Sequence, residues 1–255
     1  MSAYFNEIDP FAAEWLRNLI KAGLIADGEV DTRSIVDVRP VDLQGFVQCH
    51  FFAGVGVWSY AARQAGWSDD RPIWTGSCPC QPFSGAGRRG GFDDERHLWP
   101  VFYGLIRECL PAVVFGEQVA SADGLAWLDA VHADMEASRY AFGAADMCAA
   151  SLGAPHIRQR LWWVGKRLEH AESDGRIERR SEPSGRSTIG GRGPDNPWAN
   201  AEWLECRDGR QRPIEPGLEP LAHGIAGRVG RLRAYGNAIV APVATAFIEA
   251  VMEAS

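Results

Sequence analysis

Long apolar runs and paired C-x-x-C motifs are missing from this sequence, and lysine is nearly so. No apolar stretch approaches the roughly 20 residues that a membrane-spanning helix needs. The N-terminus lacks the basic and apolar parts of a signal peptide, so we expect a cytoplasmic protein. Without paired cysteine knuckles we expect no structural metal, and cysteines in a reducing compartment should be free thiols.

The charge distribution leaves the partner class open. The net charge of −7 argues mildly against a nucleic-acid partner. Lys21 and Lys166 are the only lysines among the 26 Lys and Arg residues, and residues 166–233 carry 13 basic and 11 acidic side chains. This concentration of arginine fits a surface that contacts phosphates, and it equally fits a solvated loop of mixed charge.

Residues 1–165 alternate between predicted strands and predicted helices. Apolar runs predict strands at residues 3–6, 34–38, 46–52, 73–76, 112–115, 140–148 and 161–164. Helical spacing or capping residues predict helices at residues 10–22, 57–65, 98–109 and 125–138. The alternation implies an α/β fold in which helices cover both faces of a parallel sheet.

The composition changes after Lys166. Residues 169–200 are rich in Gly, Ser, Pro and Arg, which predicts a flexible loop. Residues 203–212 are predicted to form a hairpin around Asp208-Gly209. Residues 236–252 begin with a turn and continue as a helix despite Pro242.

A glycine turn links the predicted strand 46–52 to the following helix. Its residues are Phe52, Ala53, Gly54, Val55 and Gly56. Glycines at such a turn allow a cofactor to approach the backbone closely. A tight packing turn remains the alternative, and a nicotinamide or flavin site lacks the complete G-x-G-x-x-G pattern.

A cysteine-proline segment follows the predicted strand 73–76. Its residues run from Cys78-Pro79-Cys80 through Gln81-Pro82-Phe83-Ser84 into a loop that carries Arg88 and Arg89. A cysteine covered by a cationic loop suits a nucleophile that acts on an anionic substrate. A buried structural cysteine, or a Cys-x-Cys metal or redox pair, are the alternatives.

A carboxylate and two arginines follow at later strand positions. Glu117 comes directly after the predicted strand 112–115, where partial burial would raise its pKa and make it a usable acid. His156, Arg158 and Arg160 alternate, so a strand would align them on one face. An exposed glutamate and a solvated edge strand are the alternatives.

Taken together, these segments resemble the DNA (cytosine-5) methyltransferase family. The Phe-Ala-Gly-x-Gly turn is similar to the family's first motif, and residues 76–84 with 91–96 are similar to its catalytic motif and loop. Glu117-Gln118-Val119 stands where the family has Glu-Asn-Val. Residues 156–160 resemble its Gln-x-Arg-x-Arg motif, and residues 235–240 resemble its last motif.

The resemblance implies a Rossmann-like S-adenosylmethionine-dependent methyltransferase sheet with a small, partly irregular target-recognition region. Residues 1–165 and 228–255 would form the catalytic domain, and residues 166–227 the recognition region. The family usually places two strand–helix units between its first motif and Pro-Cys-Gln, but only a short helix fits here. Residues 6–13 resemble the second motif, so we expect the second and third motifs to precede the first. A right-handed crossover would then join the strands before Ala53 and Ser77.

The resemblance assigns roles to individual residues. Cys80 would attack C6 of cytosine, Glu117 would hydrogen-bond N3 in its protonated form, and Arg158 and Arg160 would hold O2 or a phosphate. A cytosine flipped out of duplex DNA is the expected substrate. S-adenosyl-L-methionine would contact Glu7, Ile8, Ser34 (or Asp37 in its place), Phe52, Ala53, Gly54, Val55, Gly56, Pro79, Leu98, Asn237 and Ile239. DNA would contact Gln81, Ser84, Arg88 and Arg89.

Three competing functions remain at this point. The same chemistry on RNA is the nearest, and a catalytically weak protein that binds or masks DNA with the same fold is the second. A nicotinamide oxidoreductase is the third. We expect a monomer that binds double-stranded DNA, while its target sequence and its role as a restriction–modification, orphan or phage-encoded enzyme are not readable from the chain.

Overall fold

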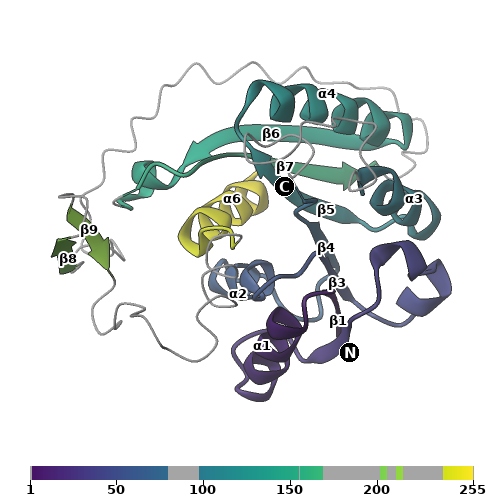
Figure 1. The fold of residues 1–255 in the computed structure, drawn as a ribbon. Helices are drawn as coiled ribbons and strands as arrows, with labels where there is room; N and C mark the ends of the chain where they lie inside the picture. Colours follow the sequence, from purple (N-terminus) through teal and green to yellow (C-terminus); the bar gives the residue numbers. More distant parts are fainter. Residues whose placement is uncertain are drawn as a thin grey trace.

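A computed structural model describes residues 2–79, 98–154, 156–168, 202–205, 211–214 and 238–254. A seven-stranded sheet with the order β2-β1-β3-β4-β5-β7-β6 forms its centre (Figure 1). The strands are β1 Ala3–Asn6, β2 Gly28–Asp31, β3 Gln48–Phe51, β4 Ile73–Gly76, β5 Val113–Val119, β6 Tyr140–Cys148 and β7 Gln159–Arg167. The expected α/β class is confirmed. The sheet is mixed, however, because β7 runs antiparallel to both of its neighbours.

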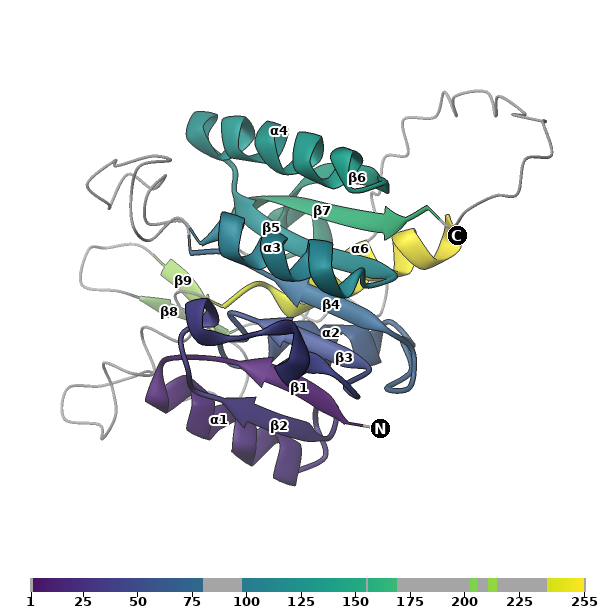
Figure 2. The same ribbon diagram turned by 90° about the vertical axis from the view of Figure 1, so that its right-hand side faces the viewer.

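Helices cover both faces of the sheet. Helices α1 Pro10–Lys21, α2 Val57–Gln64 and α6 Ala241–Glu253 lie on one face (Figure 1). Helices α3 Trp99–Cys109 and α4 Ala122–Ala137 lie on the other, as Figure 2 shows. Pro242 stands in the first turn of α6, where its missing N–H costs no helical hydrogen bond. The predicted C-terminal helix therefore forms despite this proline.

Aromatic side chains fix the strands that lead to the candidate site. Trp163 lies against Gly116 of β5 so closely that a Cβ on this glycine would stand 2.2 Å from the indole ring. Phe102 of α3 lies over Gly76 of β4 in the same way. On the other face, Phe115 packs edge-on against Trp67 and Phe247. These contacts hold the carboxyl ends of β4 and β5 in place.

The connection through α2 has an unusual hand. Helices α2 and α4 carry the chain in the same direction across the sheet, from β3 to β4 and from β5 to β6, but they cover opposite faces. Helix α1 carries the chain in the reverse direction on the face that α2 occupies. The crossover through α2 therefore has the opposite hand to the other two. Because about 98% of parallel crossovers are right-handed, the α2 crossover is the left-handed one, and the expected right-handed connection is wrong.

The strand predicted at residues 34–38 is also wrong. The strand beside β1 is β2, and Ile35–Asp37 forms a short 3-10 turn. The Ser34 hydroxyl accepts the backbone N–H of Val36 at 3.4 Å, which favours the turn over an extended conformation. β2 escaped prediction because its sequence, GEVD, has no apolar run. It is an edge strand with partly exposed residues.

Two later predictions are refined. β5 continues to Val119, so Glu117 lies within the strand instead of after it, and β7 pairs along this whole length. The predicted hairpin is confirmed in its two strands, β8 Glu202–Glu205 and β9 Gln211–Ile214, which pair antiparallel. Asp208-Gly209, residues 169–200 and residues 236–237 lie outside the described residues. Among the described residues, no helix is long and apolar enough to cross a membrane.

Candidate functional site

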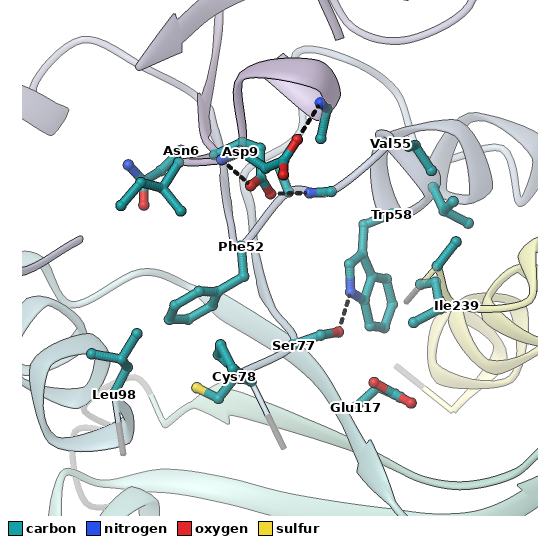
Figure 3. Close-up of a pocket in the computed structure, with 18 of the residues that line it drawn as sticks. Asn6, Asp9, Phe52, Val55, Trp58, Ser77, Cys78, Leu98, Glu117 and Ile239 are labelled. Carbon is teal, nitrogen blue, oxygen red and sulfur yellow. Dashed lines mark hydrogen bonds between the residues drawn. The ribbon is translucent and has the colours of Figure 1, made fainter. Parts of the chain in front are cut away.

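A cavity of about 370 Å³ opens at the carboxyl ends of β1, β3, β4 and β5 (Figure 3). α/β sheets place ligands at this edge, where the strand order changes direction. The cavity brings together residues that are far apart in the sequence. The predicted site residues that line it are Glu7, Ile8, Ser34, Phe52, Ala53, Gly54, Val55, Pro79, Leu98, Glu117, Arg158, Arg160 and Ile239.

Other predicted site residues are not part of the described lining. Cys80, Gln81, Ser84, Arg88, Arg89 and Asn237 lie outside the described residues. Cys78 and Pro79, which precede Cys80 in the sequence, do line the cavity. The Cys78 side chain is buried, and this burial raises the pKa of its thiol. Cys78 is therefore held as a neutral thiol in the cavity wall.

Glu7 joins two loops at one end of the cavity. Its Oε2 accepts the backbone N–H of Gly54 at 2.7 Å, and its Oε1 accepts the backbone N–H of Asp9 at 2.8 Å. Burial raises the pKa of the Glu7 carboxyl, while these N–H groups act in the opposite direction. The carboxylate thus connects the loop after β1 with the glycine turn after β3.

The two glycines of the turn have different tasks. Gly54 and Gly56 both have positive φ, +54° and +81°. Gly54 lines the cavity, whereas Gly56 does not. A Cβ on Gly56 would lie 3.0 Å from Cδ2 of Leu16 in α1. Gly56 therefore permits close packing of α1 against the start of α2, and Gly54 exposes backbone to the cavity.

Glu117 lies at the other end of the cavity and is only 8% exposed. Arg160 Nε stands 2.8 Å from its Oε1. The Ser77 hydroxyl, which also lines the cavity, accepts the indole N–H of Trp58 at 3.0 Å (Figure 3). Burial raises the pKa of Glu117, and Arg160 and Arg158 oppose this shift. The net rise makes the carboxyl a candidate proton donor.

The arginine pair reaches the cavity by a different route from the predicted one. β7 begins at Gln159, so His156 and Arg158 precede the strand, and His156 is exposed outside the cavity. The predicted alignment of His156 with the arginines on one strand face is wrong. Arg158 has φ +28°, and this turn of the backbone lets it enter the cavity beside Arg160. Its Nη2 donates to the carbonyl of Ala238 at 2.5 Å, which joins the segment before α6 to the site.

Several lining residues were missed by the sequence reasoning. Asn6, Trp58 and Ser77 line the cavity, and each makes a hydrogen bond that orients a neighbour. Asn6 directly precedes Glu7 and Ser77 directly precedes Cys78, so adjacency to a predicted site residue was the available signal. Asp37, the alternative to Ser34, is exposed and does not line the cavity. Within the described part of the chain, no group of three or more His, Cys, Asp or Glu side chains could hold a metal ion.

One family model matches part of the chain. Residues 68–191 match the profile of the C-5 cytosine-specific DNA methylases. This match confirms the predicted resemblance, and it spans the cysteine motif, Glu117 and the arginine pair. No curated protein matches the chain significantly.

Several solved methyltransferase structures match part of the chain. Spodoptera frugiperda DNMT2, in an E260A/E261A/K263A mutant, has a TM-score of 0.44 and 15% identity over 70% of this chain and 45% of its own. S. pombe Dnmt2 methyltransferase has a TM-score of 0.41 and 13% identity over 68% and 53%. A putative DNA modification methyltransferase from an Escherichia coli prophage has 0.33 and 16% over 66% and 47%. The chain spans about half the length of these proteins, and the scores are too low to indicate its activity.

Proposed function

We propose that this chain belongs to the C-5 cytosine-specific DNA methylases and methylates C5 of cytosine in duplex DNA with S-adenosyl-L-methionine. The carrying observation is the single cavity that unites the glycine turn, Cys78-Pro79 and the Glu117–Arg160 pair. A cofactor end and a reacting end in one cavity are what a group-transfer enzyme needs.

The cavity suits S-adenosylmethionine. Its volume lies within the range of roughly 300–1,000 Å³ that is usual for small-molecule sites. Ile8, Phe52 and Leu98 supply apolar walls for the adenine, and the Glu7 carboxylate is an acceptor for ribose hydroxyls. The rest of the cofactor would be surrounded by the backbone of Ala53, Gly54 and Val55 and by Pro79, Ile239 and Asn237. When bound, the cofactor supplies an electrophilic methyl group on a sulfonium.

Cys80 is the proposed nucleophile. Cytosine C5 is a poor nucleophile until a thiolate adds to C6, which makes C5 enamine-like. After C5 has taken the methyl group, loss of the C5 proton and elimination of the thiolate restore the ring. The neighbouring Cys78 is unsuited to this role, because its burial raises the pKa of its thiol.

Glu117 and the arginines would stabilise the base during attack. A protonated Glu117 can donate to N3 of cytosine, and the rise in its pKa from burial favours this form. Arg160 lies against Glu117 and can reach O2 of a base that bonds to the same carboxyl. Arg158 donates to the carbonyl of Ala238, and with Arg160 it would hold O2 of the base or a neighbouring phosphate.

The substrate would be a cytosine flipped out of the duplex, since a stacked base cannot enter a cavity at the sheet edge. Gln81, Ser84, Arg88 and Arg89 are the proposed DNA contacts. Residues 166–227 are the proposed recognition region beside a catalytic domain of residues 1–165 and 228–255. We also propose a cytoplasmic monomer.

We further propose that the family's second and third motifs precede its first motif here. β1 and β2 lie on the far side of β3 from β4, and Glu7 and Ser34 reach the cavity from there. The left-handed α2 crossover supports this order. In the proposed rearrangement, the helix after the first motif stays on its face of the sheet, but the chain then continues to β4 and not to the strand on the other side of β3. A connection that keeps its face and reverses its direction across the sheet has the opposite hand.

Methyl transfer tests the proposal directly. Labelled methyl groups from S-adenosylmethionine should enter duplex DNA and not tRNA, and bisulfite sequencing of DNA from expressing cells should show protected cytosines. Transfer of the label to tRNA and not to DNA would favour the RNA alternative. DNA binding without transfer to either would favour the DNA-masking alternative.

A further inference from the structure

Asn6, the last residue of β1, has a side chain with one end bound and one end free. It is 3% exposed and lines the cavity. Its Nδ2 donates to the carbonyl of Arg33 at 2.9 Å and to the carbonyl of Asp31 at 3.4 Å. Among the described residues, no partner is found for its Oδ1. Both amide hydrogens are therefore used, and the acceptor is not.

The orientation of this carboxamide is determined by its surroundings. Two backbone carbonyls face the same end of the side chain, and only the NH₂ group can satisfy them. The oxygen must occupy the opposite end. Figure 3 shows Asn6, Phe52 and Leu98 on the same side of the cavity, across from Trp58 and Ile239; Phe52 and Leu98 are the proposed apolar walls for adenine.

The carbonyls that hold Asn6 belong to a rigid segment. The Tyr4 hydroxyl donates to Asp31 Oδ2 at 2.6 Å. Arg33 bonds to Asp31 at 2.7 Å and to Asp42 at 3.2 Å, so its loop is fastened on both sides. The Asn6 oxygen is thus preorganised, which lowers the entropy cost of binding a ligand there.

Other acceptors near this end are already engaged or lie elsewhere. The Ser34 hydroxyl accepts the N–H of Val36. Each oxygen of Glu7 accepts a backbone N–H. Asp37 does not line the cavity. Unlike the Ser34 hydroxyl and the two Glu7 oxygens, Asn6 Oδ1 accepts no hydrogen bond from the described residues, although Glu7 keeps lone pairs for the ribose hydroxyls.

We propose that Asn6 Oδ1 accepts a hydrogen bond from the 6-amino group of the cofactor's adenine and thereby selects a 6-aminopurine over a 6-oxopurine. The inference rests on the proposed cofactor. An amine donates to this oxygen, whereas a 6-oxo group would set two acceptors against each other and leave both unsatisfied in a buried place. Asn6 is thus a specificity-determining residue of the cofactor end.

Two ligands test this in the unaltered 255-residue chain. Calorimetry should give S-adenosylhomocysteine at least about tenfold tighter binding than its deaminated 6-oxo analogue, since an unmade buried hydrogen bond changes affinity on that order. Equal affinities would overturn the inference and leave the proposed function standing. If neither ligand binds folded protein, the proposed cofactor fails together with it.

A matched pair of variants identifies the residue. Asn6→Ala should reduce the ratio of the two affinities to a value between about 1 and 2, mainly because S-adenosylhomocysteine binds more weakly. Ser34→Ala should leave the ratio unchanged. Thermal unfolding checks that both variants are folded. If Ser34→Ala removes the preference and Asn6→Ala retains it, the assignment to Asn6 is overturned. The comparison in the unaltered chain decides the selectivity even if Asn6→Ala does not fold.

Discussion

The two ends of the cavity each hold a glutamate, partly buried at Glu7 and buried at Glu117, but the partners of the two carboxyls differ in kind. Glu7 is held by backbone N–H groups of Asp9 and Gly54. Glu117 is held by the charged Arg160. Burial raises the pKa at both ends. Partners therefore distinguish the ends more than burial does.

This difference indicates how each end works. Main-chain bonds at Glu7 tie two loops together and preform a binding surface before any ligand arrives. Side-chain charges at Glu117 can exchange partners, so a substrate can replace Arg160 and the carboxyl can change its protonation state. We therefore propose that one end binds the cofactor and the other carries the reaction, and the following experiments can separate the two roles.

Glu117→Gln should have the largest effect. It keeps the shape of the side chain and removes the acid, so single-turnover methylation should fall about 100-fold or more. Binding of S-adenosylhomocysteine should stay within about twofold, because Glu117 belongs to the other end. If cofactor affinity falls as far as the rate does, the separation of the two ends is wrong.

Glu7→Gln should show the reverse pattern. Its single carbonyl oxygen cannot accept both backbone N–H groups, so S-adenosylhomocysteine affinity should fall about tenfold while the rate at saturating cofactor changes little. Glu14→Gln is the matched control, since the Glu14 side chain is 63% exposed and, within the described part of the chain, forms an ion pair with Arg17 alone. Calorimetry would contradict the prediction if both variants bound alike.

The pH dependence of the two ends should have opposite signs. Glu117 acts in its protonated form, so the saturated rate should fall as pH rises through its raised pKa. Glu7 acts as an acceptor, so cofactor affinity should fall as pH drops through the raised pKa of Glu7. Rate and affinity profiles measured on the same preparation report both. If the rate of Glu117→Gln still falls as pH rises, the decrease comes from the titration of another group.

The glycine pair gives the smallest expected effect. Gly56→Ala should lower the free energy of unfolding by about 1–3 kcal/mol, because φ is positive and its Cβ would crowd Leu16. Gly54→Ala should cost about 1 kcal/mol, since the nearest atom to its Cβ would be the Phe52 carbonyl oxygen at 4.0 Å. Urea unfolding measures both. Equal losses would mean that packing against α1 does not distinguish the two glycines.

Much of the cavity was predictable because its residues sit in short motifs at strand ends. Glu7, Gly54 and Glu117 each follow or end an apolar run, and runs of that kind become buried parallel strands. Their meeting at one edge follows from parallel strand direction.

The failures share a cause, which is that tertiary contacts overrode local pattern. Polar β2 forms a strand because β1 offers it an edge, and Arg158 enters the cavity through a positive φ that no periodicity reports. The hand of the α2 connection depends on its packing against α6 and Phe115, which lie far away in the sequence. Asn6 was missed because its proposed role rests on the carbonyl of Asp31, in the strand β2 that was not predicted, and on that of Arg33 just after it.

Trapping of a covalent adduct tests the central claim most directly. Duplex DNA in which 5-fluorocytosine replaces cytosine requires no knowledge of the target sequence, and the fluorine prevents the final elimination. With S-adenosylmethionine, the account predicts a complex that survives denaturation, with the DNA linked to Cys80 in peptide mapping, and no such complex for Cys80→Ala. A Cys80→Ala protein that still forms the complex, or that methylates DNA at the full rate, would contradict it.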